Sequence, residues 1–208
     1  MEVYQSIHGE DHYAVAVLQS NIATVYKNLK ELDQRLLYQF KSLEIIKSLH
    51  RVNHHETAGN YLGLGHIYYE YKDYEKAANL YAVAAKIYIE IYGETHPSTA
   101  ATYNNMATAY EKQGEYKKAL DYALKSMEIQ VTIDPENYSR IGTTCHQITM
   151  IYEKLEKYEE AIEFFERTIE IKKVVYGEDH PFVTIIDTQI GLAQLKAGKN
   201  TEEPEGST

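Results

Sequence analysis

The sequence predicts an all-α protein, a solenoid of antiparallel helix pairs, and three observations lead to that prediction. Residues of matching type recur every 42 positions along the 208-residue chain. Within each repeat, apolar residues follow the spacing of an amphipathic helix. Glycine and proline recur at the places where one helix would end and the next begin.

The repeat is clearest in series of residues that share one period. A tyrosine recurs every 42 positions, at Tyr26, Tyr68, Tyr110 and Tyr152. An isoleucine keeps the same period at Ile45, Ile87, Ile129 and Ile171. A small residue does so at Ala23, Gly65, Ala107, Thr149 and Gly191. Independent series with one period indicate an array of structural repeats.

Each repeat is expected to hold two antiparallel helices, a first helix A and a second helix B. In residues 102–130, Tyr103, Met106 and Tyr110 follow the i, i+3, i+7 spacing of one helix face. Gly114 then interrupts the pattern, and a second apolar stripe starts at Tyr116. The small residues are expected where two helices approach closely, and the tyrosines fill larger gaps.

A hexapeptide marks the joint between one repeat and the next. YGETHP (92–97) returns as YGEDHP (176–181), where helix B of one repeat meets helix A of the following one. The glycine of each copy is predicted to adopt the left-handed conformation that closes a helix. The proline of each copy suits the first turn of the next helix, which needs no N–H donor.

The predicted elements follow one another along the whole chain. They are a lead-in over 1–11, repeats over about 12–53, 54–95, 96–137 and 138–179, a capping helix over 182–197, and a disordered polar tail over 198–208. The lead-in matches the last turn of a helix B, so the chain either begins inside a longer array or starts with a frayed segment. The tail has too little apolar surface to become ordered.

Composition limits the class of partner. The net charge of −10 and a pI of about 5.4 make nucleic acid and anionic membrane surfaces poor partners. The single cysteine, Cys145, excludes an intrachain disulfide and fits a reducing compartment. No apolar run approaches the roughly 20 residues of a membrane span. We therefore expect a cytoplasmic protein with no membrane insertion.

The histidines suggest a metal site, which the repeat argues against. His50, His54 and His55 cluster in the sequence HRVNHH, but His54 shares its repeat position with His96 and His180. Such histidines are expected to belong to the joints, and no H-E-x-x-H motif occurs. We predict no metal, no cofactor and no catalytic residue.

Several motifs together resemble a known repeat family. The stretch YNNMATAY (103–110), the tyrosine and alanine that open helix B (Tyr116 and Ala119) and the YGEDHP joint resemble tetratricopeptide repeats of the 42-residue subtype found in kinesin light chains. The resemblance covers about residues 3–197. It implies a right-handed superhelix of four full repeats and a capping helix, with the A helices lining its concave side. Arg35 departs from the pattern, because other repeats have alanine there, and looser packing is expected around it.

The resemblance also implies a peptide-binding groove on the exposed face of the A helices. The candidate peptide-binding residues are Asn28, Leu62, His66, Tyr69, Asn104, Asn105, Thr108, Lys112, His146, Met150, Lys154, Thr188 and Leu192. Asn104 and Asn105 match the paired asparagines that contact cargo peptide in kinesin-light-chain-like domains. Asn104 is expected to hold a peptide backbone, whereas Lys112, Lys154 and His146 would favour an acidic neighbour.

Two functions from different classes remain open at this point. The first is a non-catalytic adaptor that binds a short peptide segment of a partner protein in the groove. The second is a structural subunit or domain packed permanently within a larger assembly. The apolar residues Ile185, Leu192 and Leu195 of the last helix would then serve self-association, or else pack against another helix, a neighbour or the tail.

Overall fold

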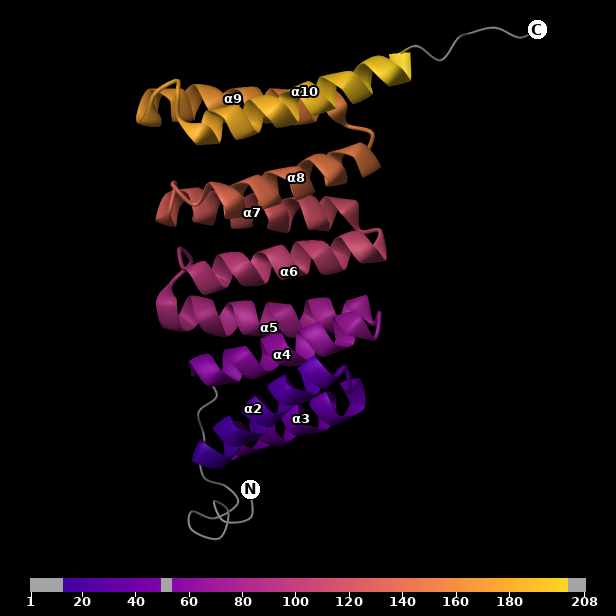
Figure 1. Ribbon diagram of the computed structural model, residues 1–208, viewed down its shortest axis with the longest axis vertical. Helices are drawn as coiled ribbons and strands as arrows, with labels where there is room; N and C mark the ends of the chain where they lie inside the picture. Colours follow the sequence, from indigo (N-terminus) through magenta and orange to yellow (C-terminus); the bar gives the residue numbers. More distant parts are fainter. Residues whose placement is uncertain (1–12, 50–53, 202–208) are drawn as a thin grey trace, which may run out of the picture. The chain divides into compact units, whose positions relative to one another are not determined.

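The computed structural model of the chain describes residues 13–49 and 54–201 (Figure 1). Within these residues all regular secondary structure is helical, which confirms the all-α prediction. The helices are α2 (Tyr13–Leu29), α3 (Leu32–Ser48), α4 (His55–Glu70), α5 (Tyr74–Tyr92), α6 (Pro97–Gln113), α7 (Tyr116–Ile133), α8 (Tyr138–Lys154), α9 (Tyr158–Tyr176) and α10 (Pro181–Thr201). The predicted lead-in, His50 and the tail beyond residue 201 lie outside the described residues.

The helices follow the predicted order of A and B helices, and they divide into two compact units. The N-terminal unit is Met1–Gln113 and holds α2 to α6, and the C-terminal unit is Gly114–Thr208 and holds α7 to α10. The A helix of the third predicted repeat, α6, therefore belongs to one unit, and its B helix, α7, to the other. Each unit is described separately below.

In the N-terminal unit, A and B helices pack alternately. α2 packs against α3 and α4 against α5, while α3 also contacts α4 and α5 contacts α6. One apolar cluster joins Leu43 of α3 to Leu64 and Ile67 of α4. Burial of these side chains between successive hairpins stabilises the stack, because no hairpin can bury its apolar faces alone.

A close helix approach lies within the second hairpin. A Cβ added at Gly65 of α4 would lie 2.4 Å from Cε1 of Tyr81 in α5. Tyr81 is buried, and its ring also contacts His66 edge-on, with centroids 5.5 Å apart. The small residue in the repeat pattern is therefore required here for helix packing.

Polar contacts join α3 to α4. Arg35, which is only 5% exposed, forms an ion pair with Glu70 in which Nη1 and Oε1 are 2.6 Å apart. The buried amide of Gln39 donates to Oδ1 of Asn60 over 2.7 Å. The expectation of loose packing at Arg35 is wrong, because the long side chain fills its position and its charge finds a partner on the next helix.

The joint before α6 has the predicted residues in their roles, with one difference. Gly93 has φ +86° and ψ 173° and caps α5, so its backbone is extended with positive φ rather than left-handed helical. Essentially only glycine occupies that region. Pro97 begins α6, and Nδ1 of His96 accepts a hydrogen bond from the backbone N–H of Ser98 over 3.2 Å. The recurrent histidine thus acts here as a helix cap.

In the C-terminal unit, α7 packs against α8, α9 against α10, and α8 also contacts α10. The hydroxyl of Thr149 in α8 and Oε1 of Gln189 in α10 are hydrogen-bonded at 2.9 Å within buried surroundings. Phe165 of α9 and Phe182 of α10 are among the most buried large side chains. α10 ends at Thr201 rather than near residue 197, so the first residues of the predicted tail are helical.

Substitution of Ala119 with leucine is expected to destabilise the protein. Ala119 lies in α7 with a fully buried side chain, so the added atoms have no free space. Overpacking of this kind costs about 1–3 kcal/mol. Urea denaturation followed by circular dichroism measures the loss. Lys117→Leu, at an exposed position of the same helix, serves as the control and should change stability little.

Candidate functional site

A cavity opens between α2 and α4 of the N-terminal unit, and side chains of α3 and α5 also line it. Its volume is about 310 Å³. It is lined by Val17, Ser20, Asn21, Ser42, Ile46, His55, Glu56, Gly59, Asn60 and Tyr88. None of the candidate peptide-binding residues predicted from the sequence lines this cavity, although Val17, Ser20 and Gly59 belong to the A helices α2 and α4. The volume is at the lower end of the range for ligand pockets.

Gly59 helps to keep this cavity open. A Cβ built at Gly59 would meet no atom within 4 Å. The corresponding A-helix positions of the next two repeats, Ala101 and Thr143, carry side chains. The second repeat therefore lacks a side chain at the point where its A helix faces the cavity.

Glu56, in the first turn of α4, is the acidic group of the cavity. Its Oε1 accepts a hydrogen bond from the hydroxyl of Tyr13 and lies 3.1 Å from Nε2 of His55. Its Oε2 contacts Nδ1 of His54. Carboxylates near a helix N-terminus are also stabilised by the helix dipole. These contacts fix the orientation of the carboxylate.

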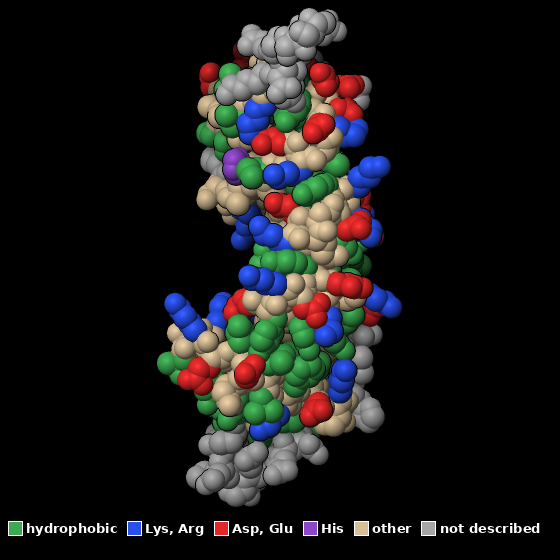
Figure 2. Space-filling model, turned by 90° about the vertical axis from the view of Figure 1, so that its right-hand side faces the viewer, with side chains coloured by type: hydrophobic (Ala, Val, Ile, Leu, Met, Phe, Trp, Pro, Cys, Tyr) green, Lys and Arg blue, Asp and Glu red, His purple; other side chains and the backbone are tan. Residues whose placement is uncertain are grey.

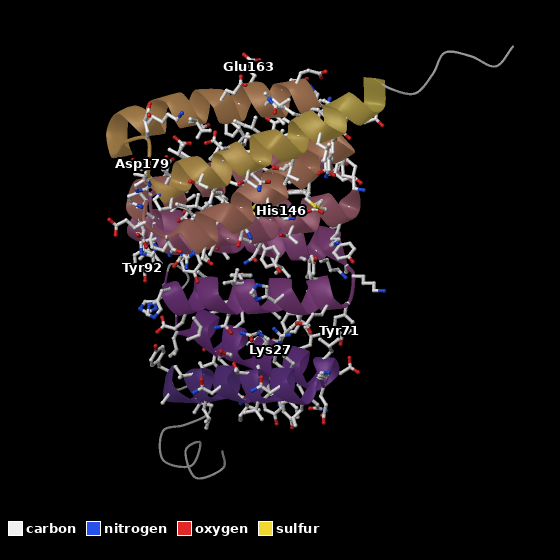
Figure 3. All side chains as sticks on the ribbon, turned by 45° about the horizontal axis from the view of Figure 1, so that its top comes forward. Lys27, Tyr71, Tyr92, His146, Glu163 and Asp179 are labelled. Carbon is white, nitrogen blue, oxygen red and sulfur yellow. The ribbon has the colours of Figure 1, made fainter. Side chains whose placement is uncertain are left out.

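A second polar region lies where α4 meets α6. The side chain of Asn105 in α6 is hydrogen-bonded to His66 in α4, so two of the predicted site residues contact each other. The pKa of His66 is lowered, first by burial and then by the positive charges of Arg35 and Lys27. Lys27 is labelled on α2 in Figure 3. A neutral imidazole is therefore favoured at this position.

Asn104, next to that contact, has an acceptor with free capacity. Its side-chain Oδ1 is buried and accepts no hydrogen bond from any described residue. Leaving such an atom unpaired costs about 1–3 kcal/mol. The sequence predicts that Asn104 holds a peptide backbone, and because this atom is buried, that role requires its side chain to turn towards the surface.

The other predicted residues of the N-terminal unit differ in accessibility. Asn28 and Lys112 are exposed. Leu62 packs against the apolar cluster of Ala58, Ala84, Ile87 and Tyr88, so it has a structural role that the sequence analysis did not expect.

Two further predicted residues make contacts inside their own unit. Tyr69 meets Tyr74 edge-on with ring centroids 5.2 Å apart, and burial is the main cause that raises its pKa. The hydroxyl of Thr108 donates to the carbonyl of Asn104 within α6 over 3.0 Å.

The predicted residues of the C-terminal unit lie on α8 and α10. His146 (labelled in Figure 3), Met150 and Lys154 are exposed on α8. Thr188 and Leu192 are exposed on α10, where the hydroxyl of Thr188 donates to the carbonyl of Thr184 over 2.8 Å. The two helices are also linked by an ion pair between Lys196 and Glu153.

Sequence reasoning missed the polar residues that shape the cavity, chiefly His55, Glu56 and Asn60. No repeat series contains Glu56, because its counterparts Ser98 and Arg140 differ in type. This departure from the repeat pattern at Glu56 is the sequence feature that could have indicated a functional residue. The lining residues come together because side chains of α2, α3, α4 and α5 face one cavity, which the periodicity alone does not show.

Among residues 13–49 and 54–201, His54, His55 and Glu56 form a group that could hold a metal ion. One ligand atom from each lies within 4.8 Å of the other two. The prediction of no metal site implies that chelation leaves the protein unchanged. We expect the melting temperature to be the same with and without EDTA, and zinc chloride at stoichiometric concentration to cause no shift. A zinc-dependent rise would contradict that prediction.

Cys145 is expected to be unreactive in the folded protein. Its thiol is fully buried in α8, where Sγ lies 3.4 Å from Sδ of Met127, and burial raises its pKa to about 12. The thiol therefore stays protonated near pH 8 and reacts slowly with iodoacetamide. Mass spectrometry should show rapid labelling only after denaturation. Because the folded state retains this proton longer than the unfolded chain, stability should fall as the pH rises from about 9 towards 12.

The surface has no single-sign character on the face shown in Figure 2, where acidic and basic side chains are interspersed. Within the described residues, no helix combines the length and apolar character needed to cross a bilayer.

The fold and the site define a class of protein: an array of helical-hairpin repeats with an accessible A-helix face. Models of the tetratricopeptide repeat match residues 84–130 and residues 57–98 and 142–182, together more than half of the chain. The chain belongs to the tetratricopeptide repeat family. A search of the curated proteins gave no match.

Solved structures support the same fold. One is a kinesin-light-chain-type protein of Podosopora anserina whose TPR-like repeats are nearly identical to one another. It shares 20% sequence identity with this chain, with a TM-score of 0.70 over 92% of this chain and 90% of that chain. BtubC (BKLC) from P. vanneervenii is 19% identical, with a TM-score of 0.63 over 94% and 85%. The apo form of RapI is 19% identical, with a TM-score of 0.68 over 96% of this chain and 54% of that chain. The predicted kinesin-light-chain-like repeat fold is confirmed.

Proposed function

We propose that the chain is a non-catalytic adaptor that binds a short segment of a partner protein on the A-helix face of its N-terminal unit. Arrays of this kind present extended surfaces to other proteins, and the family membership makes a protein-interaction role the general expectation. The observation that carries the specific proposal is the cavity of about 310 Å³ between α2 and α4. It can receive one side chain of a bound segment.

The amide groups near α6 supply a second kind of contact. The unpaired Oδ1 of Asn104 is buried, so it can accept a backbone N–H from an extended segment once its side chain turns towards the surface. The neighbouring Asn105 interacts with His66 of α4, so part of its hydrogen-bonding capacity is used within the N-terminal unit. Exposed Lys112, about two turns further along α6, would favour an acidic residue of the ligand.

A peptide display screen against the full chain tests the proposal. Peptides recovered in the screen are expected to lose binding by about tenfold or more in Gly59→Leu, because the new side chain fills the cavity. Binding should also weaken in Asn104→Ala, which removes the acceptor. Gly59→Leu should keep or raise the melting temperature, since the position is open and leucine favours helix.

Two variants serve as matched controls. Gly191→Leu fills open space at another helical glycine, in α10, and Asn79→Ala removes an exposed asparagine of α5. Neither should change binding. Recovered peptides that bind Gly59→Leu and Asn104→Ala as tightly as the original chain, or a screen that recovers none, would overturn the proposal.

A structural subunit remains the second candidate, because the apolar surface of α10 is accessible. Leu195 is 58% exposed and Leu192 36%. If this surface is an assembly contact, sedimentation velocity should show concentration-dependent association that Leu195→Asp abolishes. The adaptor proposal instead predicts a monomer at all concentrations and the same sedimentation coefficient for the variant.

A further inference from the structure

We infer that the cavity between α2 and α4 binds the side chain of a lysine or arginine in the partner segment. The inference rests on the proposed function and deepens it, because it assigns the chemistry of one ligand residue. It is carried by the placement of one oriented carboxylate inside a small cavity with apolar and polar walls.

The charge inside the cavity selects for a cation. Among the lining residues, none is lysine or arginine, and Glu56 is the one aspartate or glutamate. Its side chain is 18% exposed, so a bound cation would interact with it in surroundings that are partly shielded from water. A carboxylate ligand would be repelled at the same place.

The carboxylate is held in position and keeps room for another donor. Tyr13, His54 and His55 contact its two oxygens. A carboxylate offers about four acceptor positions, so an ammonium or guanidinium group can add a further hydrogen bond. A hydrogen bond from a cationic donor to this carboxylate would be charge-assisted, and such hydrogen bonds are the stronger ones.

The walls suit the rest of a long basic side chain. Val17, Ile46 and Tyr88 provide apolar surface that the methylene groups of lysine or arginine can cover. Ser20 and Asn21 form no side-chain hydrogen bond with another described residue, so their polar groups can bind a ligand without breaking an internal contact. A cavity of about 310 Å³ is sized for one such side chain rather than for a folded ligand.

Four amino-acid derivatives test the inference on the full chain near pH 8, where imidazole is generally neutral. The probes are the N-acetyl methylamides of lysine, arginine, norleucine and glutamate, in buffer with EDTA. Titration is followed by backbone amide signals of Ser20, Asn21 and Gly59 in ¹⁵N spectra. The lysine and arginine probes should bind about tenfold or more tightly than the norleucine probe, and the glutamate probe should not bind.

Two variants locate the effect. Glu56→Gln should reduce the preference for lysine over norleucine to less than about twofold, while binding of norleucine persists. Gly59→Leu should abolish shifts with every probe, and Gly191→Leu should leave them unchanged. Equal binding of lysine and norleucine, an unaltered preference in Glu56→Gln, or no shift with any probe up to tens of millimolar would overturn the inference.

The outcomes separate this inference from the proposed function. Display peptides that bind in a Gly59-dependent manner but carry no lysine or arginine would leave the adaptor proposal standing and remove the basic anchor. If the chain binds the cationic probes preferentially but the screen recovers no peptide, the cation-binding inference stands. The proposed peptide-binding function would then be wrong.

Discussion

Gly65→Ala is expected to destabilise the N-terminal unit by about 1–3 kcal/mol, although alanine favours helices. The added Cβ would lie 2.4 Å from Cε1 and 2.6 Å from Cδ1 of Tyr81. The ring is buried, so either the ring or the two helices α4 and α5 must shift to admit the methyl group. Urea denaturation monitored by circular dichroism measures the change, and hydrogen exchange should place it in these two helices.

The same helix provides a matched control. Gly59→Ala adds the same methyl group where no atom lies within 4 Å. This variant should be more stable than the original chain, by up to about 1 kcal/mol, because glycine is costly within a helix. Opposite signs for the two variants are the expected result. Stabilisation by both would show that α4 and α5 are further apart than described.

Phe165→Ala is expected to have the largest effect in the C-terminal unit, about 3–5 kcal/mol. Phe165 in α9 is 0% exposed and is among the largest fully buried side chains. Its removal leaves a cavity that the surrounding helices can fill only in part. The measurement is the free energy of unfolding in urea.

Phe164→Ala is the control for this prediction, because it removes the same side chain at a half-buried position. The two rings are neighbours, with centroids 5.4 Å apart. The loss at Phe164 should be clearly smaller than the loss at Phe165. Equal losses would mean that burial does not distinguish the two positions.

The fold could be predicted from the sequence because every repeat obeys the same packing rules. Period and helical spacing together predicted the A and B helices from Tyr13 onwards, and the prolines marked the start of α6 and α10. The small residues of one repeat series have different packing roles in different repeats. Gly65 is needed for contact with Tyr81, whereas a Cβ at Gly191 would meet nothing within 4 Å. Periodicity identifies a position but does not show what lies opposite.

The candidate site was predicted less completely, since it depends on side chains that break the repeat. The register placed Asn104, Asn105 and His66 on the A-helix face, and His66 and Asn105 do contact each other. The same register placed Leu62 there, but Leu62 packs against the buried cluster that includes Ala84 of α5. The cavity around Glu56 arises from side chains of four different helices, and no single-repeat pattern contains that information.

The contacts between α3 and α4 limit the use of these hairpins as interchangeable modules. Suppose that α6 were transplanted to follow α3 in place of α4. Thr102 would then replace Asn60 opposite Gln39, and Lys112 would replace Glu70 beside the shielded guanidinium of Arg35. Asn105 would replace Gly63, where even a Cβ would lie 2.9 Å from Gln39. Such a chimera would combine like charges with a steric clash, so the residues at this junction determine which hairpin can follow α3.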